Sequence, residues 1–234
     1  MLPVAILSGG LATRLRPITE TIPKAMVEVA GKPFVYHQLE DLARQGIRSV
    51  VLCVGYLGEM IEAAVGNGAR FGLAVEYSYD GDTLLGTGGA IKKALPSLGA
   101  EFFILYGDSF LPIDLSAVHD AYKEKQKIAL MTVFKNDGQW DTSNVEFEND
   151  RLIEYNKCLP NARMKYIDYG VSILNAAALD EPEWTGKFDL ADLFYSLSKR
   201  SNLAGLEVFE RFYEIGSHTG LAEAQQYFLN QQHR

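Results

Sequence analysis

The sequence predicts an α/β fold whose mixed, mostly parallel central sheet is covered by helices on both faces. Two observations lead to this expectation. In the first half of the chain, short apolar runs alternate with segments of helical periodicity, an order typical of β–α–β units. In the second half, several short strand-like runs are separated by turn residues, which indicates antiparallel pairing. The chain has no internal repeat or linker, so we expect a single domain over residues 1–234.

The first half should begin with a buried strand at Val4 to Leu7, an apolar run that ends at a pair of glycines. A helix is expected from Phe34 to Gln45, because its apolar residues recur at helical spacing and Gly46 follows it. The other elements expected in this half are a strand within Ser49 to Tyr56, a helix at Leu57 to Val65, a strand at Leu73 to Tyr77, a helix at Thr87 to Leu95 that closes near Pro96, and a strand at Phe102 to Tyr106.

The second half changes from alternating elements to a series of strands with turn residues between them. A helix and a final strand–helix pair then close the chain. The expected elements are strands at Ile128 to Phe134, Asn144 to Phe147, Leu152 to Tyr155 and Tyr166 to Leu174, a helix at Asp189 to Lys199, a strand at Leu206 to Tyr213, and a helix at Leu221 to Leu229.

Composition limits the function. The formal charge of −8 argues against nucleic acid and anionic membranes as partners, because binding them needs an excess of basic residues. Residues 1–33 differ, with four basic residues against two acidic ones, which indicates a local anion site. The amino terminus lacks the pattern of a signal peptide, and no apolar run approaches the roughly 18 residues of a membrane span, so we expect a cytoplasmic protein.

The two cysteines, Cys53 and Cys158, are too few and too far apart for a disulfide framework or a zinc site. We expect reduced thiols. A catalytic role for Cys158 is not favoured, because no local pattern supplies it with a paired base.

The loop after the first strand carries the main chemical signal. It contains neither the P-loop pattern nor the dinucleotide fingerprint. Backbone N–H groups in such a glycine turn can surround phosphate oxygens, Arg14 can bind phosphate through a forked pair of hydrogen bonds, and Lys24 adds a point charge. The residues expected to bind a nucleotide here are Leu7, Ser8, Gly9, Gly10, Leu11, Ala12 and Thr13, with Arg14 and Lys24 as catalytic groups.

This loop resembles the opening signature of the sugar-1-phosphate nucleotidyltransferase family, Gly-Gly-x-Gly-Thr-Arg-Leu-x-Pro-x-Thr followed by Lys-Pro. Two residues depart from it, because Ala12 replaces a glycine and Ala25 replaces the proline after Lys24. The resemblance spans essentially the whole chain. It implies a Rossmann-like three-layer α/β/α fold with a small antiparallel sugar-binding part, and transfer of a nucleotide from a nucleoside triphosphate to a sugar 1-phosphate, with release of pyrophosphate. The alternative interpretation of the loop is an ordinary tight β–α turn.

Two further groups fit this resemblance. Gly86, Thr87 and Gly88 lie in a glycine-rich helix start that resembles the family's nucleoside-binding loop, although such starts also serve packing alone. Asp108 follows an apolar strand and resembles the family's metal-binding aspartate; Mg²⁺ favours one or two carboxylates completed by phosphates and water. Glu214 stands where the family has a second metal-binding aspartate. The alternatives are a turn residue for Asp108 and a surface or ion-paired side chain for Glu214.

On the sugar side, the resemblance implies that Lys157 binds the sugar phosphate and that Asp168 and Gly170 hold sugar hydroxyls. Asp168 replaces the family's asparagine, and the spacing of Lys157 from the preceding acid is altered. Gly107 and Asn144 complete the expected sugar-phosphate site, although Asn144 also suits an ordinary turn.

Within the family, the chain most resembles capsule-type heptose-1-phosphate guanylyltransferases, which favours GTP; uridylyl- and cytidylyltransferases come next. Base discrimination is expected from the Tyr79 to Thr83 segment. Two other classes stay open. One is a nucleotide-sugar-dependent glycosyltransferase, because Asp80-Gly81-Asp82 has an Asp-x-Asp form. The other is a non-catalytic nucleotide-sugar sensor. The sequence leaves the oligomeric state open, a homo-oligomer included.

Overall fold

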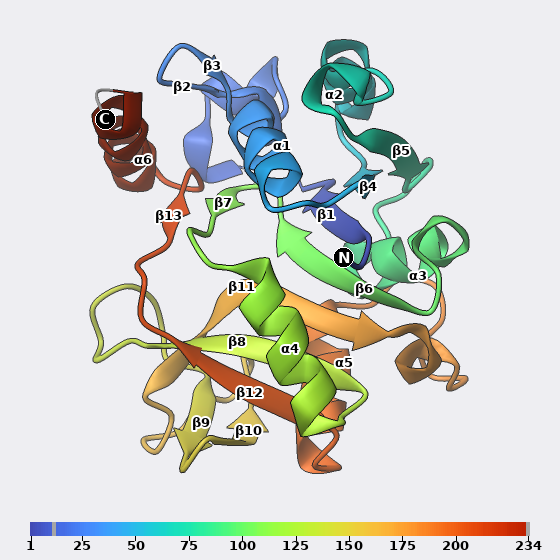
Figure 1. Cartoon of the computed structure of the whole chain (residues 1–234), viewed down its shortest axis with the longest axis vertical. Coiled ribbons are helices and arrows are strands. Elements are labelled where there is room, and N and C mark those ends of the chain that lie inside the picture. The colour runs from blue at the N-terminus through green and yellow to red at the C-terminus, as the bar shows by residue number, and fades with distance from the viewer. Residues whose placement is uncertain (11–12, 233–234) are drawn as a thin grey trace.

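The computed structural model describes residues 1–10 and 13–232, which are arranged around a nine-stranded mixed sheet (Figure 1). The strand order is β10-β9-β11-β6-β1-β4-β5, and β8 pairs with both β11 and β12. The strands are β1 (Val4–Ser8), β4 (Ser49–Val54), β5 (Ala74–Tyr79), β6 (Glu101–Tyr106), β8 (Ala129–Lys135), β9 (Val145–Glu148), β10 (Arg151–Tyr155), β11 (Tyr166–Asn175) and β12 (Leu203–Val208).

The first half of the chain forms a parallel group of strands, β5-β4-β1-β6. Ile6 lies opposite Leu52 on one side and Leu105 on the other. Since parallel neighbours all end at one edge of the sheet, the loops after β1, β4, β5 and β6 meet there. This edge is where a site is expected.

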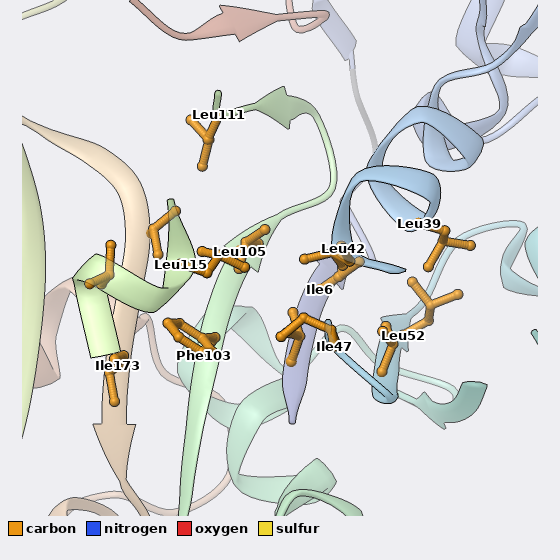
Figure 2. Packing of buried hydrophobic residues seen from close by; sticks show 14 of the residues in the cluster. Ile6, Leu39, Leu42, Ile47, Leu52, Phe103, Leu105, Leu111, Leu115 and Ile173 are labelled. Carbon is orange, nitrogen blue, oxygen red and sulfur yellow. The ribbon is translucent and has the colours of Figure 1, made fainter. Parts of the chain in front are cut away.

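Helices cover both faces of the sheet, as the alternation of side chains along β1 shows. Ile6 belongs to a core cluster with residues of α1 (Phe34–Arg44), α2 (Gly58–Val65) and α4 (Leu115–Lys125). Ala5, on the opposite face, packs with residues of α3 (Gly86–Leu98) and α5 (Leu190–Lys199). Figure 2 shows the first cluster, with Leu42 of α1 over the sheet near Ile6. The predicted α/β fold with a mixed, mostly parallel sheet and helices on both faces is confirmed.

The second half adds the antiparallel part. β11 runs antiparallel to both β6 and β8, and β9 and β10 form a hairpin at the end of the sheet. β11 therefore joins the two halves of the molecule through continuous backbone hydrogen bonding. β12 returns parallel to β8 and leads to the last segment of the chain.

That last segment packs against the loop that follows β1. The loop contains the 3₁₀ turns Thr13–Leu15, Ile18–Glu20 and Lys24–Met26 and the short strands β2 (Glu28–Val29) and β3 (Lys32–Pro33). The closing segment contains β13 (Tyr213–Glu214), which pairs with β7 (Ser109–Phe110), and helix α6 (His218–Gln232). A third apolar cluster joins them, formed by Leu15, Val27, Val29, Phe34, Phe110, Ile215, Ala224 and Phe228. Residues far apart in sequence are thereby fixed around one edge of the sheet.

The elements differ from the expectations in three places. Helix α4 was not predicted, although Asp114 caps it by accepting a hydrogen bond from the Ser116 amide at 2.8 Å. Helix α3 continues past Pro96 to Leu98, although this proline lacks the N–H that would donate to the Lys92 carbonyl. The strand expected at Leu206 to Tyr213 is two strands, separated by an exposed Phe209. Within the described ranges, no helix has the length and apolar character needed to cross a membrane.

Candidate active site

A cavity of about 260 Å³ opens where β1 and β6 end and α3 begins. It brings together most of the residues expected to bind a nucleotide. The predicted site residues that line it are Leu7, Ser8, Gly9, Gly10, Lys24, Gly86, Thr87, Gly107 and Asp108. Leu11 and Ala12 lie outside the described residues. A second hollow of about 420 Å³, between α1 and α6, contains no predicted site residue among those described.

Lys24 and Asp108 form an ion pair at the edge of this cavity. Lys24 Nζ donates to Asp108 Oδ2 at 2.9 Å, although 84 residues separate them. Both side chains are partly covered, with 18% and 32% of their surfaces exposed. The second carboxylate oxygen of Asp108 accepts a hydrogen bond from the Ser109 hydroxyl at 3.2 Å. The two charges predicted from separate motifs therefore meet at one point.

Arg14 and Glu214 lie beside this pair. A Cβ placed on Gly216 would be 3.1 Å from Arg14 Nη2 and 3.4 Å from Lys24 Nζ, so the two cations converge on Gly216. Glu214 lies opposite Ser109 in the β7–β13 pair, and the Ile215 amide donates to the Asp108 carbonyl at 2.9 Å. The Glu214 carboxylate accepts hydrogen bonds from the Gly216 amide and, at 2.6 Å, from the Ser217 hydroxyl. The fold therefore brings two cationic and two anionic side chains to this edge.

The turn that carries Asp108 is held on two sides. Gly107 approaches β1 so closely that a Cβ there would overlap Ser8 Oγ and lie 2.9 Å from the Leu7 carbonyl oxygen. From α1, the buried Gln38 side chain donates to the carbonyl oxygens of Tyr106 and Ser109 at 2.9 and 2.8 Å. Sequence reasoning missed Gln38; its only signal is a polar residue on the apolar face of a predicted helix.

The glycine-rich start of α3 packs against the segment around Phe188. A Cβ on Gly88 would overlap the Phe188 ring, and the amides of Gly88 and Gly89 donate to the Phe188 carbonyl at 3.0 and 3.2 Å. Gly88 does not line the cavity, whereas Gly86 and Thr87 do. The Cβ side of Gly88 therefore packs against a protein segment, in agreement with the packing alternative for this glycine-rich helix start.

Thr87 links the cavity to an acid that the sequence did not reveal. The Thr87 hydroxyl donates to Asp189 Oδ1 at 3.3 Å and accepts from the Leu190 amide at 2.8 Å. Asp189 lines the cavity at its rim. Cys53 also lines the wall, and burial raises the pKa of its thiol to about 12, so it stays protonated and unreactive near neutral pH.

Of the predicted sugar-side residues, Gly107 lines the cavity, whereas Asn144, Asp168 and Gly170 contact one another outside its lining. Asp168 Oδ1 accepts the Gly170 amide at 3.0 Å, and Asn144 Oδ1 accepts the Asp168 amide at 3.1 Å. Burial raises the pKa of Asp168 to about 6, against the opposing effects of the Gly170 hydrogen bond and the Lys157 charge. Asn144 thus positions the Asp168 backbone.

Tyr106 connects the two groups. Burial raises the pKa of the Tyr106 hydroxyl well above its ordinary value, and the negative charges of Asp168 and Asp108 act in the same direction. Tyr106 also lines the cavity. Tyr106 therefore lies close to an acid from each of the two predicted groups. Within the described part of the chain, no group of three or more His, Cys, Asp or Glu side chains could hold a metal ion.

Comparison with known proteins agrees with this arrangement. Residues 4–231 match the family model described as nucleotidyl transferase. A D-glycero-α-D-manno-heptose 1-phosphate guanylyltransferase of Campylobacter jejuni is 32% identical over 90% of this chain and 93% of its own length. A UTP–glucose-1-phosphate uridylyltransferase of Synechocystis is 30% identical over 82% of this chain, but over only 54% of its own length.

The fold matches as well. The crystal structure of HddC from Yersinia pseudotuberculosis superposes with a TM-score of 0.81 at 24% identity, covering 97% of this chain and all of that one. The chain therefore belongs to the nucleotidyl transferase family and is a sugar-1-phosphate nucleotidyltransferase.

Proposed function

We propose that this enzyme transfers a guanylyl group from GTP to a heptose or hexose 1-phosphate in the cytoplasm, forming a GDP-sugar for capsule or other cell-surface polysaccharides. The Campylobacter relative is named as a guanylyltransferase and matches this chain over 93% of its own length, which supports guanine as the base. The Synechocystis relative, named for uridylyl transfer, supports the alternative of a uridylyl- or cytidylyltransferase of the same family.

The ion pair between Lys24 and Asp108 carries the proposal. The Lys24 ammonium and the Asp108 carboxylate lie 2.9 Å apart at the edge of a cavity that Gly9 and Gly10 also line, which supports the binding of phosphates there. Arg14 reaches the same point, next to Gly216. Such a group of charges suits a triphosphate, which needs cations for its oxygens and a carboxylate for its metal.

The chemistry needs no general base. A sugar 1-phosphate is largely a dianion near neutral pH, because its second pKa is about 6. One of its oxygens bonds to the α-phosphorus of GTP while the bond from that phosphorus to the bridging oxygen breaks, and pyrophosphate leaves with the electron pair. The protein must hold two repelling anions in line, so catalysis consists of positioning and charge neutralisation.

We assign these tasks to separate groups. Arg14, Lys24 and the amides of Gly9 and Gly10 bind the triphosphate, and the positive charge of Lys157 steers the sugar phosphate. Asp168, with its carboxylate anchored by the Gly170 amide, accepts hydrogen bonds from sugar hydroxyls.

Asp108 and Glu214 fit a magnesium site. Asp108 immediately precedes β7, Glu214 is the last residue of β13, and the Ile215 amide donates to the Asp108 carbonyl. Mg²⁺ needs only one or two carboxylates when phosphates and water complete its shell. When bound, Mg²⁺ would neutralise charge on the reacting phosphate. Ser217 and the Gly216 amide orient the Glu214 carboxylate for this role.

Release of pyrophosphate tests the proposal. Wild-type enzyme with Mg²⁺ is offered GTP, UTP, CTP, ATP and dTTP, each with several sugar 1-phosphates. We expect turnover with GTP and a heptose or hexose 1-phosphate, and a loss of about 10²- to 10³-fold in Arg14→Ala, because a cation that stabilises the transition state is removed. The matched control is Arg151→Ala, an exposed arginine on strand β10. Equal turnover of Arg14→Ala and wild type would disprove the assigned role.

The two other classes make different predictions. A glycosyltransferase would release a nucleotide from a nucleotide sugar without pyrophosphate. Its Asp-x-Asp form is not supported by the geometry, because Asp80 is buried and lines the cavity while Asp82 is exposed. A sensor would bind the nucleotide sugar tightly without any turnover.

A further inference from the structure

One buried carboxylate in the cavity has no part in the mechanism described above. Asp80 follows the last residue of β5 and is only 9% exposed. Its amide donates to the Val54 carbonyl at 2.9 Å, which ties it to strand β4. Its side chain lines the cavity next to the phosphate loop, since a Cβ placed on Gly9 would lie 3.5 Å from Asp80 Oδ2.

The carboxylate is only partly paired. The Leu85 amide donates to Asp80 Oδ2 at 3.2 Å, and the nearby Lys93 ammonium donates to the Asp80 backbone oxygen rather than to its carboxylate. Across residues 1–10 and 13–232, no side chain or amide donates to Oδ1. Burial raises the pKa of Asp80, against the opposing effects of Leu85 and Lys93. Oδ1 can therefore accept hydrogen bonds from a ligand in the cavity.

The lining of the cavity carries charges of both signs. Lys24 is paired with Asp108, whereas Asp80 lies near Gly9 and the protonated thiol of Cys53. The wall near Asp80 is otherwise apolar, as Leu84 and Ala90 show. A nucleoside triphosphate matches this arrangement if its phosphates face Lys24 and its base brings hydrogen-bond donors to Asp80.

Only one common base presents two adjacent donors. On its Watson–Crick edge, guanine has N1–H beside the N2 amino group, which together match the two acceptor oxygens of an ionised carboxylate. Uracil and thymine have one N–H between two carbonyl oxygens. Cytosine and adenine have an amino group beside a ring nitrogen that accepts. In each of these four bases, an acceptor would face the carboxylate.

We propose that, in the guanylyl transfer on which this assignment rests, the Asp80 carboxylate selects GTP by accepting hydrogen bonds from guanine N1–H and N2–H. Asp80 acts as a specificity residue for the base and takes no part in phosphoryl transfer. Because a buried polar group left unpaired rejects a ligand strongly, this contact can exclude the other bases by about 10⁴-fold or more.

The first test needs no variant. The base of ITP is hypoxanthine, which differs from guanine only in lacking the N2 amino group. If Asp80 accepts both donors, kcat/KM for ITP should be roughly 10- to 100-fold below that for GTP, because one hydrogen bond to a charged group is lost. Equal kcat/KM values for ITP and GTP would overturn the proposal.

The second test exchanges an acceptor for a donor. In Asp80→Asn, the side-chain oxygen can keep the Leu85 hydrogen bond, so the amide nitrogen takes the position of Oδ1. That nitrogen is a donor, so it cannot bond to the N–H donors of guanine, but it can donate to the C2 carbonyl of xanthine. We expect kcat/KM to fall at least about 100-fold for GTP and to rise for XTP until XTP is preferred. Asp120→Asn, which changes an exposed acid on α4, should keep the wild-type preference.

The outcomes separate this proposal from the proposed function. Absence of pyrophosphate release by wild type with every nucleotide overturns the guanylyl transfer itself. A wild-type preference for UTP, dTTP, CTP or ATP leaves nucleotidyl transfer intact and overturns the role of Asp80. A preference for GTP that Asp80→Asn retains also overturns it. If Asp80→Asn does not fold, which its circular dichroism spectrum would show, the comparison of ITP with GTP in wild type decides.

Discussion

Replacing Asp168 by asparagine should stabilise the enzyme while weakening its hold on the sugar. Burial raises the pKa of this carboxyl from its ordinary 3.8 to about 6. A folded-state pKa above the unfolded value means that the folded protein loses stability as the pH rises from about 4 to about 6, and does not regain it above that range. Two pKa units at about 1.4 kcal/mol each make the ionised carboxylate unfavourable by up to about 3 kcal/mol at pH 8.

Asparagine removes this cost with little change in shape. Its side-chain oxygen can still accept the Gly170 amide, which is 3.0 Å from Asp168 Oδ1 in the structure. Asp168→Asn should therefore unfold at the same urea concentration as wild type at pH 4 and be up to about 3 kcal/mol more stable at pH 8. In a thermal scan at pH 8, the gain corresponds to roughly 2–4 °C for each kcal/mol.

The functional assay is the pyrophosphate release rate as a function of sugar 1-phosphate concentration. An ionised carboxylate accepts two hydroxyl protons strongly, and an amide oxygen accepts less strongly, so KM should rise by roughly 10-fold or more. Asp120→Asn on the surface of α4 is the matched control and should change neither stability nor KM. A variant no more stable than wild type at pH 8 would refute the reasoning from burial, and an unchanged KM would refute the sugar contact.

Three further predictions concern the turn at the end of β6. Asp108→Asn should lower the pyrophosphate release rate by about 10²- to 10³-fold with little change in thermal stability, and a rate near that of wild type would contradict its role. Gly107→Ala should destabilise the fold by about 1–3 kcal/mol in urea, because the new methyl overlaps Ser8 Oγ; wild-type stability would mean that the two strands separate easily. Gln38→Leu removes the side-chain donor to the Tyr106 and Ser109 carbonyls, so the free energy of unfolding should fall by about 1–3 kcal/mol for each carbonyl. The kcat should fall as well. A change in the KM for GTP alone would argue against a positioning role.

The sequence predicted those parts of the fold that depend on local periodicity. The strand at Val4–Ser8 and the helix at Phe34–Arg44 are found within a residue or two of their expected bounds. Helix α4 was missed even though Leu115, Val118 and Tyr122 are spaced for one helical face. The break at Phe209 could not be predicted, because it follows from β13 leaving the main sheet to pair with β7.

The same limit applies to the site. Lys24 and Asp108 could be singled out because each follows a recognisable motif, and their contact needs only that β1 and β6 end at the same edge. Gln38 and Asp189 could not be, since their importance comes from packing partners 68 and 102 residues away. For Gly88, the glycine pattern could not show that Phe188, from a distant loop, packs against its Cβ side.

The contact of Gly88 with Phe188 has a consequence for attempts to retarget the enzyme. Because the start of α3 fits against residues 186–188, these two segments are complementary surfaces that must be exchanged as a unit. Transplanting the glycine-rich segment alone from a relative would place an unmatched side chain against Phe188 or leave a void beneath it. A chimaera that carries both segments from one donor keeps the interlocking surfaces together and is the design that should fold.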